Sequence, residues 1–154
     1  MAKETYLATQ LQEGARPRTL DDHGKVRIQY FIVDVEVAGD ADSEIELCDL
    51  PPNAVRVIPN MSYIESSAFG AGRTLDIGHR AYRTTSDYAV EPQDEDFTAF
   101  AENLDIAAAG TTKLSDKLKH DTYSKGEVRV VARVQGGSVP VGAKLQGYIV
   151  YVYE

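Results

Sequence analysis

Short runs of alternating apolar and polar residues, separated by turn residues, dominate the hydrophobic pattern of this chain. In the clearest run, residues 26–37, apolar side chains hold the even positions up to Ile32 and the odd positions from Val33 onward. A period-two pattern that shifts by one residue predicts a β-bulge, or a strand that crosses from one sheet to another. Residues 127–135 alternate without such a shift. Residues 147–154 are apolar or aromatic on both faces, which predicts a central strand covered on both sides.

Shorter apolar segments, bounded by glycine, proline or asparagine, predict further strands. These segments span residues 45–50, 54–58, 62–69 and 74–77. Gly78 is expected to bend the chain after the last of them, with the strand resuming through Tyr82. The pattern of residues 104–118 is ambiguous, and we place a strand within it at residues 106–109.

One stretch, residues 93–104, has the spacing of a helix. Phe97, Phe100, Ala101 and Leu104 follow the i, i+3, i+4, i+7 pattern that places side chains on one stripe of a helix. Three carboxylates at residues 94–96 precede this stripe, where negative charge favours a helix N-terminus. We therefore predict one short helix near residues 94–104.

Together these elements amount to about eight or nine strands and one short helix, which predicts a mainly-β chain. A single-domain β-sandwich over residues 26–154 fits the pattern best, and the jelly roll is the form of sandwich considered first. Residues 1–25 precede this domain as an N-terminal arm or an edge segment. A loose terminus and an edge strand over residues 5–10 are both open for them.

The net charge of the chain bears on which partners it can bind. The chain has 154 residues, a net charge of -8 and an isoelectric point near 4.9. Such a chain repels phosphate backbones and anionic lipids, so no nucleic acid and no membrane is expected as a direct partner. The sequence begins without the apolar stretch of a signal peptide and has no run near the ~18–20 apolar residues of a membrane span. We expect synthesis in a cytoplasm.

Candidate metal ligands are scattered along the sequence. His23, His79 and His120 form no close pair of the kind that zinc, iron or cupin-type sites use, so no metal site is predicted. Two acidic segments, residues 21–23 (Asp-Asp-His) and 94–96 (Asp-Glu-Asp), contain possible cation ligands. Neither has the glycine-containing spacing of a calcium loop, and a solvated loop and a helix cap are the preferred interpretations.

Candidate nucleophiles and cofactor loops are equally sparse. Cys48 is the one cysteine, and no family signature surrounds it; if Ile45 and Leu47 face inward, Cys48 faces outward or toward a second layer. Asp76 and His79 have the residue types of half a catalytic triad, but no G-x-S-x-G motif accompanies them. Residues 70–73 (Gly-Ala-Gly-Arg) fit a turn better than a phosphate-binding loop. We therefore assign no catalytic, cofactor or metal residue and expect a protein that is not an enzyme.

The chain has nine tyrosines and no tryptophan, which is a weaker indication of a protein-binding surface. Tyrosine combines an apolar ring with a polar tip and is favoured in protein interfaces. It is also an ordinary strand residue, so the sequence alone leaves both interpretations open.

Two stretches resemble virion proteins of tailed phages. The first runs from Leu-Cys-Asp-Leu-Pro at residues 47–51 to Val-Arg-Val-Ile at residues 55–58. The second runs from Gly-Arg-Thr-Leu-Asp-Ile-Gly at residues 72–78 through an acidic segment to Ala-Ala-Ala-Gly at residues 107–110. The aromatic β-hairpin expected from residue 126 to the end completes the likeness, which covers residues 26–154.

This resemblance implies a capsid decoration, or cement, protein with a jelly-roll-like fold. Such a protein is often a trimer bound to the major capsid protein on the outside of an icosahedral head, so the implied location is the exterior of a virion assembled in a host cytoplasm. Residues 1–25 would then be an arm along a neighbouring subunit. A tail- or fibre-associated virion protein that binds a receptor or glycan is the first alternative, and a small cupin-like enzyme is the second.

Overall fold

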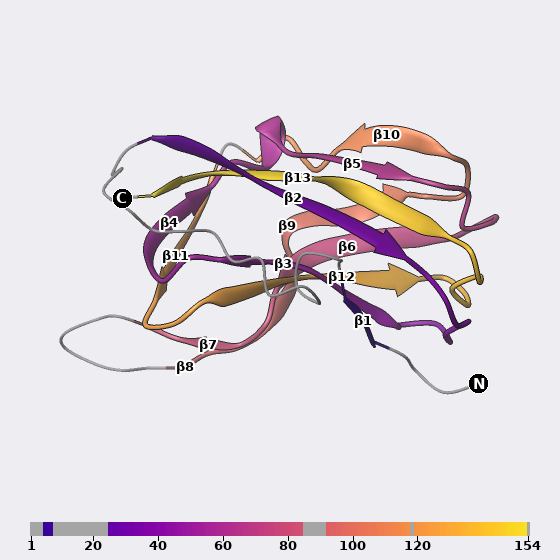
Figure 1. Cartoon of the computed structure of the whole chain (residues 1–154), viewed down its shortest axis with the longest axis horizontal. Coiled ribbons are helices and arrows are strands. Elements are labelled where there is room, and N and C mark those ends of the chain that lie inside the picture. The colour runs from indigo at the N-terminus through magenta and orange to yellow at the C-terminus, as the bar shows by residue number, and fades with distance from the viewer. Residues whose placement is uncertain (1–4, 8–24, 85–91, 118, 154) are drawn as a thin grey trace.

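Thirteen strands form two large sheets and one small ribbon in the residues that the computed structural model describes, 5–7, 25–84, 92–117 and 119–153 (Figure 1). The helical structure among these residues is one 3-10 turn, Pro59–Met61. The prediction of a mainly-β, single-domain chain is confirmed.

The first sheet has five strands. In spatial order they are β1 (Thr5–Leu7), β3 (Glu44–Leu50), β12 (Val128–Gln135), β6 (Thr74–His79) and β9 (Asp96–Asp105). All neighbours are antiparallel except β1 and β3, which pair in parallel.

The second sheet is built around the long C-terminal strand β13 (Lys144–Tyr153). On one edge β13 pairs along most of its length with β2 (Val26–Asp34). Its other edge pairs first with β5 (Tyr63–Ser66) and then with β4 (Asn53–Val57), and these strands carry β10 (Gly110–Lys113) and β11 (His120–Ser124). The prediction that the last strand is central is therefore confirmed, but it is not covered on both sides, because Gln146 is exposed and Tyr148 and Val152 are only half-buried on its outer face.

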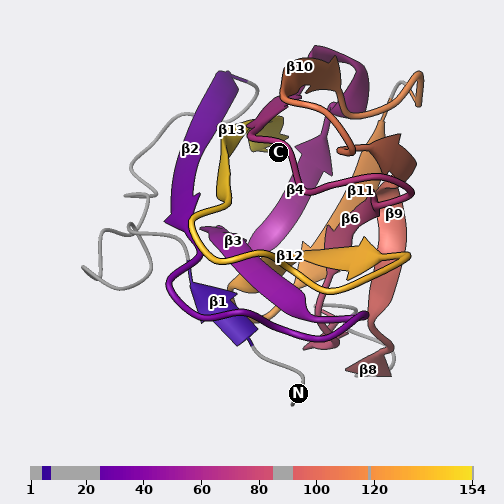
Figure 2. The ribbon, with the colours of Figure 1, turned by 90° about the vertical axis from the view of Figure 1, so that its right-hand side faces the viewer.

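The two sheets stack on each other (Figure 2), and one hydrophobic core fills the space between them. The face of β12 predicted from alternation, Val128 to Val134, points into this core and is fully buried. Phe31, Ile64 and Ile149 enter the same core from the second sheet. A short ribbon of β7 (Tyr82–Arg83) and β8 (Pro92–Gln93) extends from the first sheet, and residues 85–91 between these strands lie outside the described residues.

The helix predicted near residues 94–104 is wrong: residues 96–105 form strand β9. Its pairing with β6 is irregular in two places, between Leu75 and Ile77 and between Ile77 and His79. Extra residues in one strand interrupt the period of two. As a result, buried residues of β9 recur at spacings of three, which imitates a helix in the sequence.

The bulge predicted within residues 26–37 is also wrong. β2 pairs with β13 in unbroken register from Val26 to Asp34. Phe31 and Val33 point into the core, and the apolar residues at even positions lie on the opposite, outer face. The apparent shift arises because both faces of this strand carry apolar side chains.

Three local predictions need correction as well. Residues 106–109 form a loop, and the strand β10 begins after them at Gly110. Gly78 does not end its strand, which continues to His79; it permits close approach of β9, because a Cβ there would lie 1.8 Å from the backbone oxygen of Asp96. Cys48 faces the core together with Leu47, because a register shift in the pairing of β3 with β12 falls at this point.

A candidate protein-binding face

The outer face of β2 carries a row of exposed apolar side chains. Val26, Ile28, Tyr30 and Ile32 keep 58%, 49%, 59% and 46% of their surface exposed. They occupy alternate positions of one strand, so their side chains project from the same face of the sheet. Single exposed hydrophobic residues are common on proteins, whereas a contiguous row of four indicates an interaction surface.

A row of three tyrosines crosses this sheet at right angles to the strands. Tyr148 on β13 lies opposite Tyr30 on one side and opposite Tyr63 of β5 on the other. In both pairs the ring centroids are 5.9 Å apart, with interplanar angles of 64° and 47°. Edge and tilted contacts at this distance are favourable for aromatic rings. We call this row and the β2 row together the tyrosine face.

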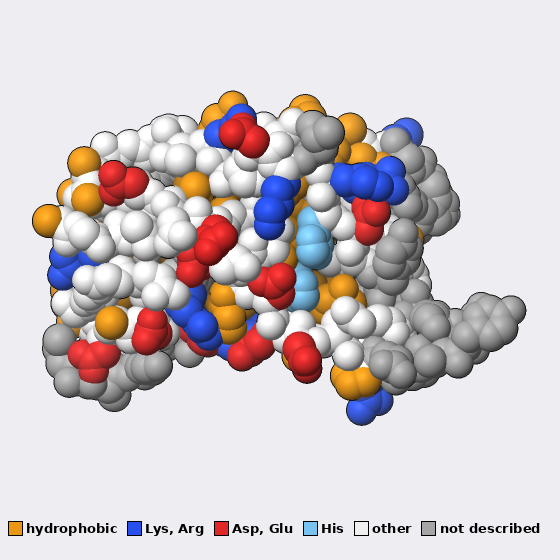
Figure 3. Space-filling view, turned by 180° about the vertical axis from the view of Figure 1, so that it is seen from behind, with side chains coloured by type: hydrophobic (Ala, Val, Ile, Leu, Met, Phe, Trp, Pro, Cys, Tyr) orange, Lys and Arg blue, Asp and Glu red, His pale blue; other side chains and the backbone are white. Residues whose placement is uncertain are grey.

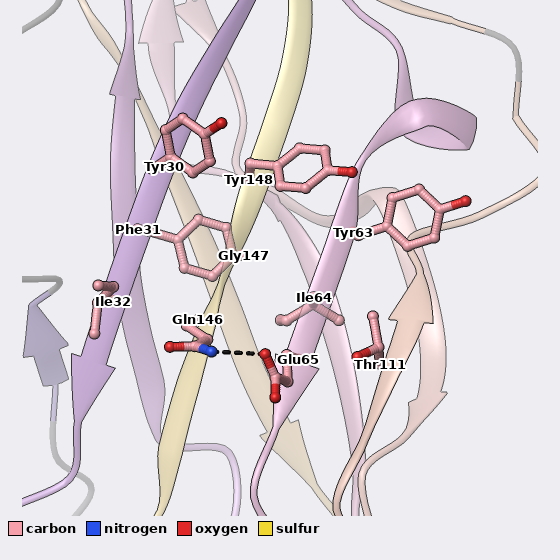
Figure 4. A pocket seen from close by; sticks show the side chains of 10 residues that line it. All are labelled: Tyr30, Phe31, Ile32, Tyr63, Ile64, Glu65, Thr111, Gln146, Gly147 and Tyr148. Atoms are coloured by element: carbon pink, nitrogen blue, oxygen red, sulfur yellow. Dashed lines mark hydrogen bonds between the residues drawn. The ribbon is translucent and has the colours of Figure 1, made fainter.

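A groove of about 360 Å³ lies beside the tyrosine row (Figure 4). Gly147 lies between Phe31 and Ile64 in the pairing of the three strands, and all three residues line the groove. The next row of outward side chains, from Ile32 to Thr111, lines it too; within that row, Gln146 Nε2 donates a hydrogen bond of 2.6 Å to Glu65 Oε2. The groove is therefore mostly apolar, with one polar pair at its side.

The charged side chains that the strand register places around the tyrosine face balance one another. Lys144 and Asp34 pair at 3.1 Å at one end of the face, and Arg56 and Asp121 pair at 2.7 Å at the other. Lys119 lies 3.3 Å from Asp121. Two further charged groups, Lys113 and Asp116, form an ion pair beside β5.

The outer face of the first sheet has a different character, because it carries a network of ion pairs. Arg129 on β12 binds Glu46 and Asp49 of β3, and Arg133 binds Glu44 at 3.0 Å. Arg80 joins the network through Glu44 at 2.6 Å. These charged groups thus have partners within the chain, whereas the tyrosine face leaves apolar groups exposed.

Two of the histidines, which form no close pair in the sequence, lie side by side in the structure. His79 and His120 lie with ring centroids 5.7 Å apart, and Phe100 lies 5.3 Å from the His120 ring. Histidine side chains form one continuous strip on the surface seen in Figure 3. Burial, and secondarily the neighbouring His79, lower the pKa of His120. Burial opposes ionisation of nearby Asp96, but hydrogen bonds from the amide and hydroxyl of Thr98 outweigh it and lower the pKa of that carboxyl.

Asp76 and His79, the two residues with triad chemistry, do not contact each other. They lie three residues apart on one strand, which puts their side chains on opposite faces. The Asp76 carboxylate accepts hydrogen bonds from the backbone amide of Asn103 at 2.8 Å and from the side-chain amide of Gln135 at 3.1 Å. The Nδ1 atom of His79 lies 3.0 Å from the backbone oxygen of Arg80. This pair therefore has a structural role in the sheet.

The remaining candidates of the sequence are in ordinary structural positions. Cys48 is fully buried, and burial raises the pKa of its thiol. Residues 70–73 form the predicted turn, with positive φ at Gly70 and Gly72. Asp94 and Glu95 are exposed in the turn before β9, and residues 21–23 lie outside the described residues.

Neither a metal-binding cluster nor a membrane-spanning helix is present in the described part of the chain. Within it, no group of three or more histidine, cysteine or acidic side chains is arranged to hold a metal ion. Nor is any helix formed by these residues long and apolar enough to cross a membrane.

Sequence reasoning missed the tyrosine face. Its signal lies in the run of apolar even positions at residues 26–32, from which the sequence predicts a bulge or a crossing between sheets and not an exposed apolar face. Three of the nine tyrosines form its central row, and these three come from distant parts of the sequence.

The chain is similar to known proteins in its fold and not in its sequence. No family model matches the sequence, and no curated protein matches it. A chain in the structure titled "Capsid of Ralstonia phage GP4" superimposes with a TM-score of 0.71 at 20% identity, over 97% of this chain and 98% of that chain. A chain in the structure "Cyanophage Pam1 capsid asymmetric unit" superimposes with a TM-score of 0.51 at 16% identity, over 92% of this chain and 96% of that chain. The fold is thus shared with these two chains over nearly their whole lengths.

Proposed function

We propose that this chain is a structural protein of a tailed-phage virion that binds the outer surface of the head shell and stabilises it. The observation that carries the proposal is the fold shared with chains of two phage capsid structures, over 97% of this chain and 98% of the other in the better match. Fold similarity alone does not determine function. Two features of the chain itself therefore have to agree with the proposal.

The first feature is the kind of surface that the chain offers. A cement protein needs wide contact with other proteins and no reaction centre. The tyrosine face, with four apolar residues of β2 exposed by 46–59%, is a surface of this kind. We accordingly propose that the chain acts by binding and not by catalysis.

The second feature is charge. A net charge of -8 keeps the chain from binding DNA without specificity, which suits a protein on the outside of a DNA-filled shell. We further propose that the protein is a homotrimer whose partner is the major capsid protein. Three linked contacts raise the total affinity well above that of each one, so modest individual contacts suffice.

Cryo-electron microscopy of purified heads, with and without added protein, tests this function. The expected result is additional density at regular positions on the outer shell, together with heads that withstand higher temperature before releasing DNA. Density found only at the tail would favour the tail- or fibre-associated alternative. Heads that take up no protein at saturating concentration would overturn the proposal.

A further inference from the structure

We propose that copies of this chain meet through the tyrosine face, so that the occupant of this face is the same face of neighbouring copies. The inference rests on the homotrimer of the proposed function and specifies which surface builds it. Around a threefold axis, each copy would turn β2 and β13 toward the axis, and the three tyrosine rows would converge there.

The first reason is the extent of the exposed apolar surface. The four apolar side chains run along β2, and one of them, Tyr30, continues the surface through Tyr148 and Tyr63 across three adjacent strands. Exposing this apolar surface to water costs free energy in a single copy, and burying it between copies removes that cost. Tyrosine suits such a contact because its ring can be buried while its hydroxyl still finds a partner.

The second reason is the charge balance of the face. Identical chains with a net charge of -8 repel each other, so they can associate only where the local charge is small. The register places three acidic side chains (Asp34, Asp121 and Glu65) and three basic ones (Lys144, Arg56 and Lys113) on this face. Asp34 pairs with Lys144, Arg56 with Asp121, and Lys113 with Asp116 in the adjoining loop. Glu65 accepts a hydrogen bond from Gln146. The excess negative charge of the chain therefore lies elsewhere.

The third reason is the groove beside the tyrosine row. Its volume of about 360 Å³ is far larger than the roughly 30 Å³ of one water molecule. Ile32, Tyr63 and Tyr148 make its walls mostly apolar. An apolar side chain from a neighbouring copy fits this groove better than water does. Its insertion would fix how the two copies are aligned at the contact.

The decisive experiment measures mass in solution by sedimentation equilibrium of the full chain. The test variant is the double substitution Ile28→Lys and Tyr30→Lys, at two positions exposed by 49% and 59%. The control is the pair Val37→Lys and Val141→Lys, because these valines are 60% and 63% exposed and lie in loops beyond the ends of β2 and β13, outside the tyrosine face. Both variants change the net charge by the same amount.

We expect the wild type and the control to be trimers and the test variant to have an association constant lower by at least about 30-fold. Circular dichroism and a thermal melt check that each variant is folded. A folded test variant with the mass of the wild type would overturn the inference, and so would a wild type that is monomeric at every concentration.

A second measurement keeps the inference testable if the lysine variant does not fold. Ile28→Cys brings thiols of neighbouring copies together at the face, so mild oxidation should link copies through disulfides, whereas Val141→Cys should not. Equal cross-linking of both variants would contradict the inference.

Shell binding separates this inference from the proposed function. If the wild type trimerises through this face but never binds heads, the proposed function fails and the inference stands. If the test variant stays trimeric but loses binding to heads, the face contacts the shell, and the inference fails while the proposed function stands.

Discussion

Phe31 and Gly147 lie directly opposite each other on β2 and β13, and the phenylalanine ring occupies the space that a side chain at position 147 would need. A Cβ atom on Gly147 would lie 2.9 Å from Cζ of Phe31 and 2.3 Å from the backbone oxygen of Tyr63. Phe31 is fully buried, so its ring cannot move aside without disturbing the core. The missing side chain lets β2, β13 and β5 pack closely beneath the tyrosine face.

We therefore expect Gly147→Ala to lower the free energy of unfolding by about 1–3 kcal/mol, the usual range for overpacking a core. Urea denaturation followed by circular dichroism measures the change. The control is Gly126→Ala, because a Cβ at Gly126 would have no neighbour within 4 Å. Equal stability of the two variants would show that the contact between positions 31 and 147 is not tight.

Strand β12 shows what the sequence could predict. Its core residues alternate without interruption from Val128 to Val134, and it has a neighbouring strand on each edge, β3 and β6. Such a run needs only local information, because a period of two already places its apolar side chains on one face. The central position of β13 was predictable for a similar reason, since every residue from Tyr148 to Tyr153 is apolar or aromatic.

Strand β9 shows what the sequence could not predict. The spacing from Ala101 to Leu104 is three because Asn103, with a positive φ of 53°, interrupts the strand, and its amide binds the Asp76 carboxylate. That contact joins residues distant in the sequence. The tyrosine row was hidden for the same reason, because Tyr30, Tyr63 and Tyr148 become neighbours only through the pairing of three separate strands.

The ion pairs between β3 and β12 give a second stability prediction. Arg129 binds the Asp49 carboxylate through Nε and Nη2, and Asp49 is only 5% exposed. Substituting Arg129→Met leaves this buried carboxylate without its cation, which we expect to cost about 2–3 kcal/mol of stability.

The control for this variant is Lys144→Met. It breaks the ion pair of Lys144 with Asp34, whose side chains are 72% and 56% exposed, and exposed pairs contribute little. We expect a change within about 0.5 kcal/mol there. If both variants lost the same stability in urea denaturation, burial of Asp49 would not be the cause.

Cys48 gives a prediction about reactivity. Its side chain is fully buried, and burial, followed by the neighbouring Asp49 carboxylate, raises the pKa of its thiol. Because the thiolate is the reactive form, we expect Ellman's reagent to react with less than a tenth of the thiol in the time that it labels one thiol per chain in denaturant. A Val141→Cys variant, with the new thiol at a 63% exposed position, should react at once. Rapid labelling of the native wild type would show that the core around Cys48 opens readily.

The histidine pair gives a prediction about acid stability. His120 lies beside His79 and Phe100, with Asp96, Lys117 and Asp121 as its charged neighbours, and its pKa is lowered mainly by burial. In the unfolded chain its pKa is about 6.5, so between that value and its lower folded value the unfolded state binds more protons. The contribution of His120 to stability is therefore complete above pH 6.5 and is lost as the pH falls through its folded pKa.

We expect the urea midpoint of the wild type to be constant between pH 8 and about pH 7, and to fall below pH 6.5. His120→Gln should remove part of this fall, because glutamine cannot take up the proton. Asp96 and Asp121 have lowered pKa values and also lose stability in acid, but only as the pH falls below their unfolded pKa of about 3.9. Measurements at pH 7.5, 6.0 and 5.0 therefore isolate the imidazoles. An unchanged slope in His120→Gln would mean that another group, and not His120, takes up the proton when the chain unfolds in this range.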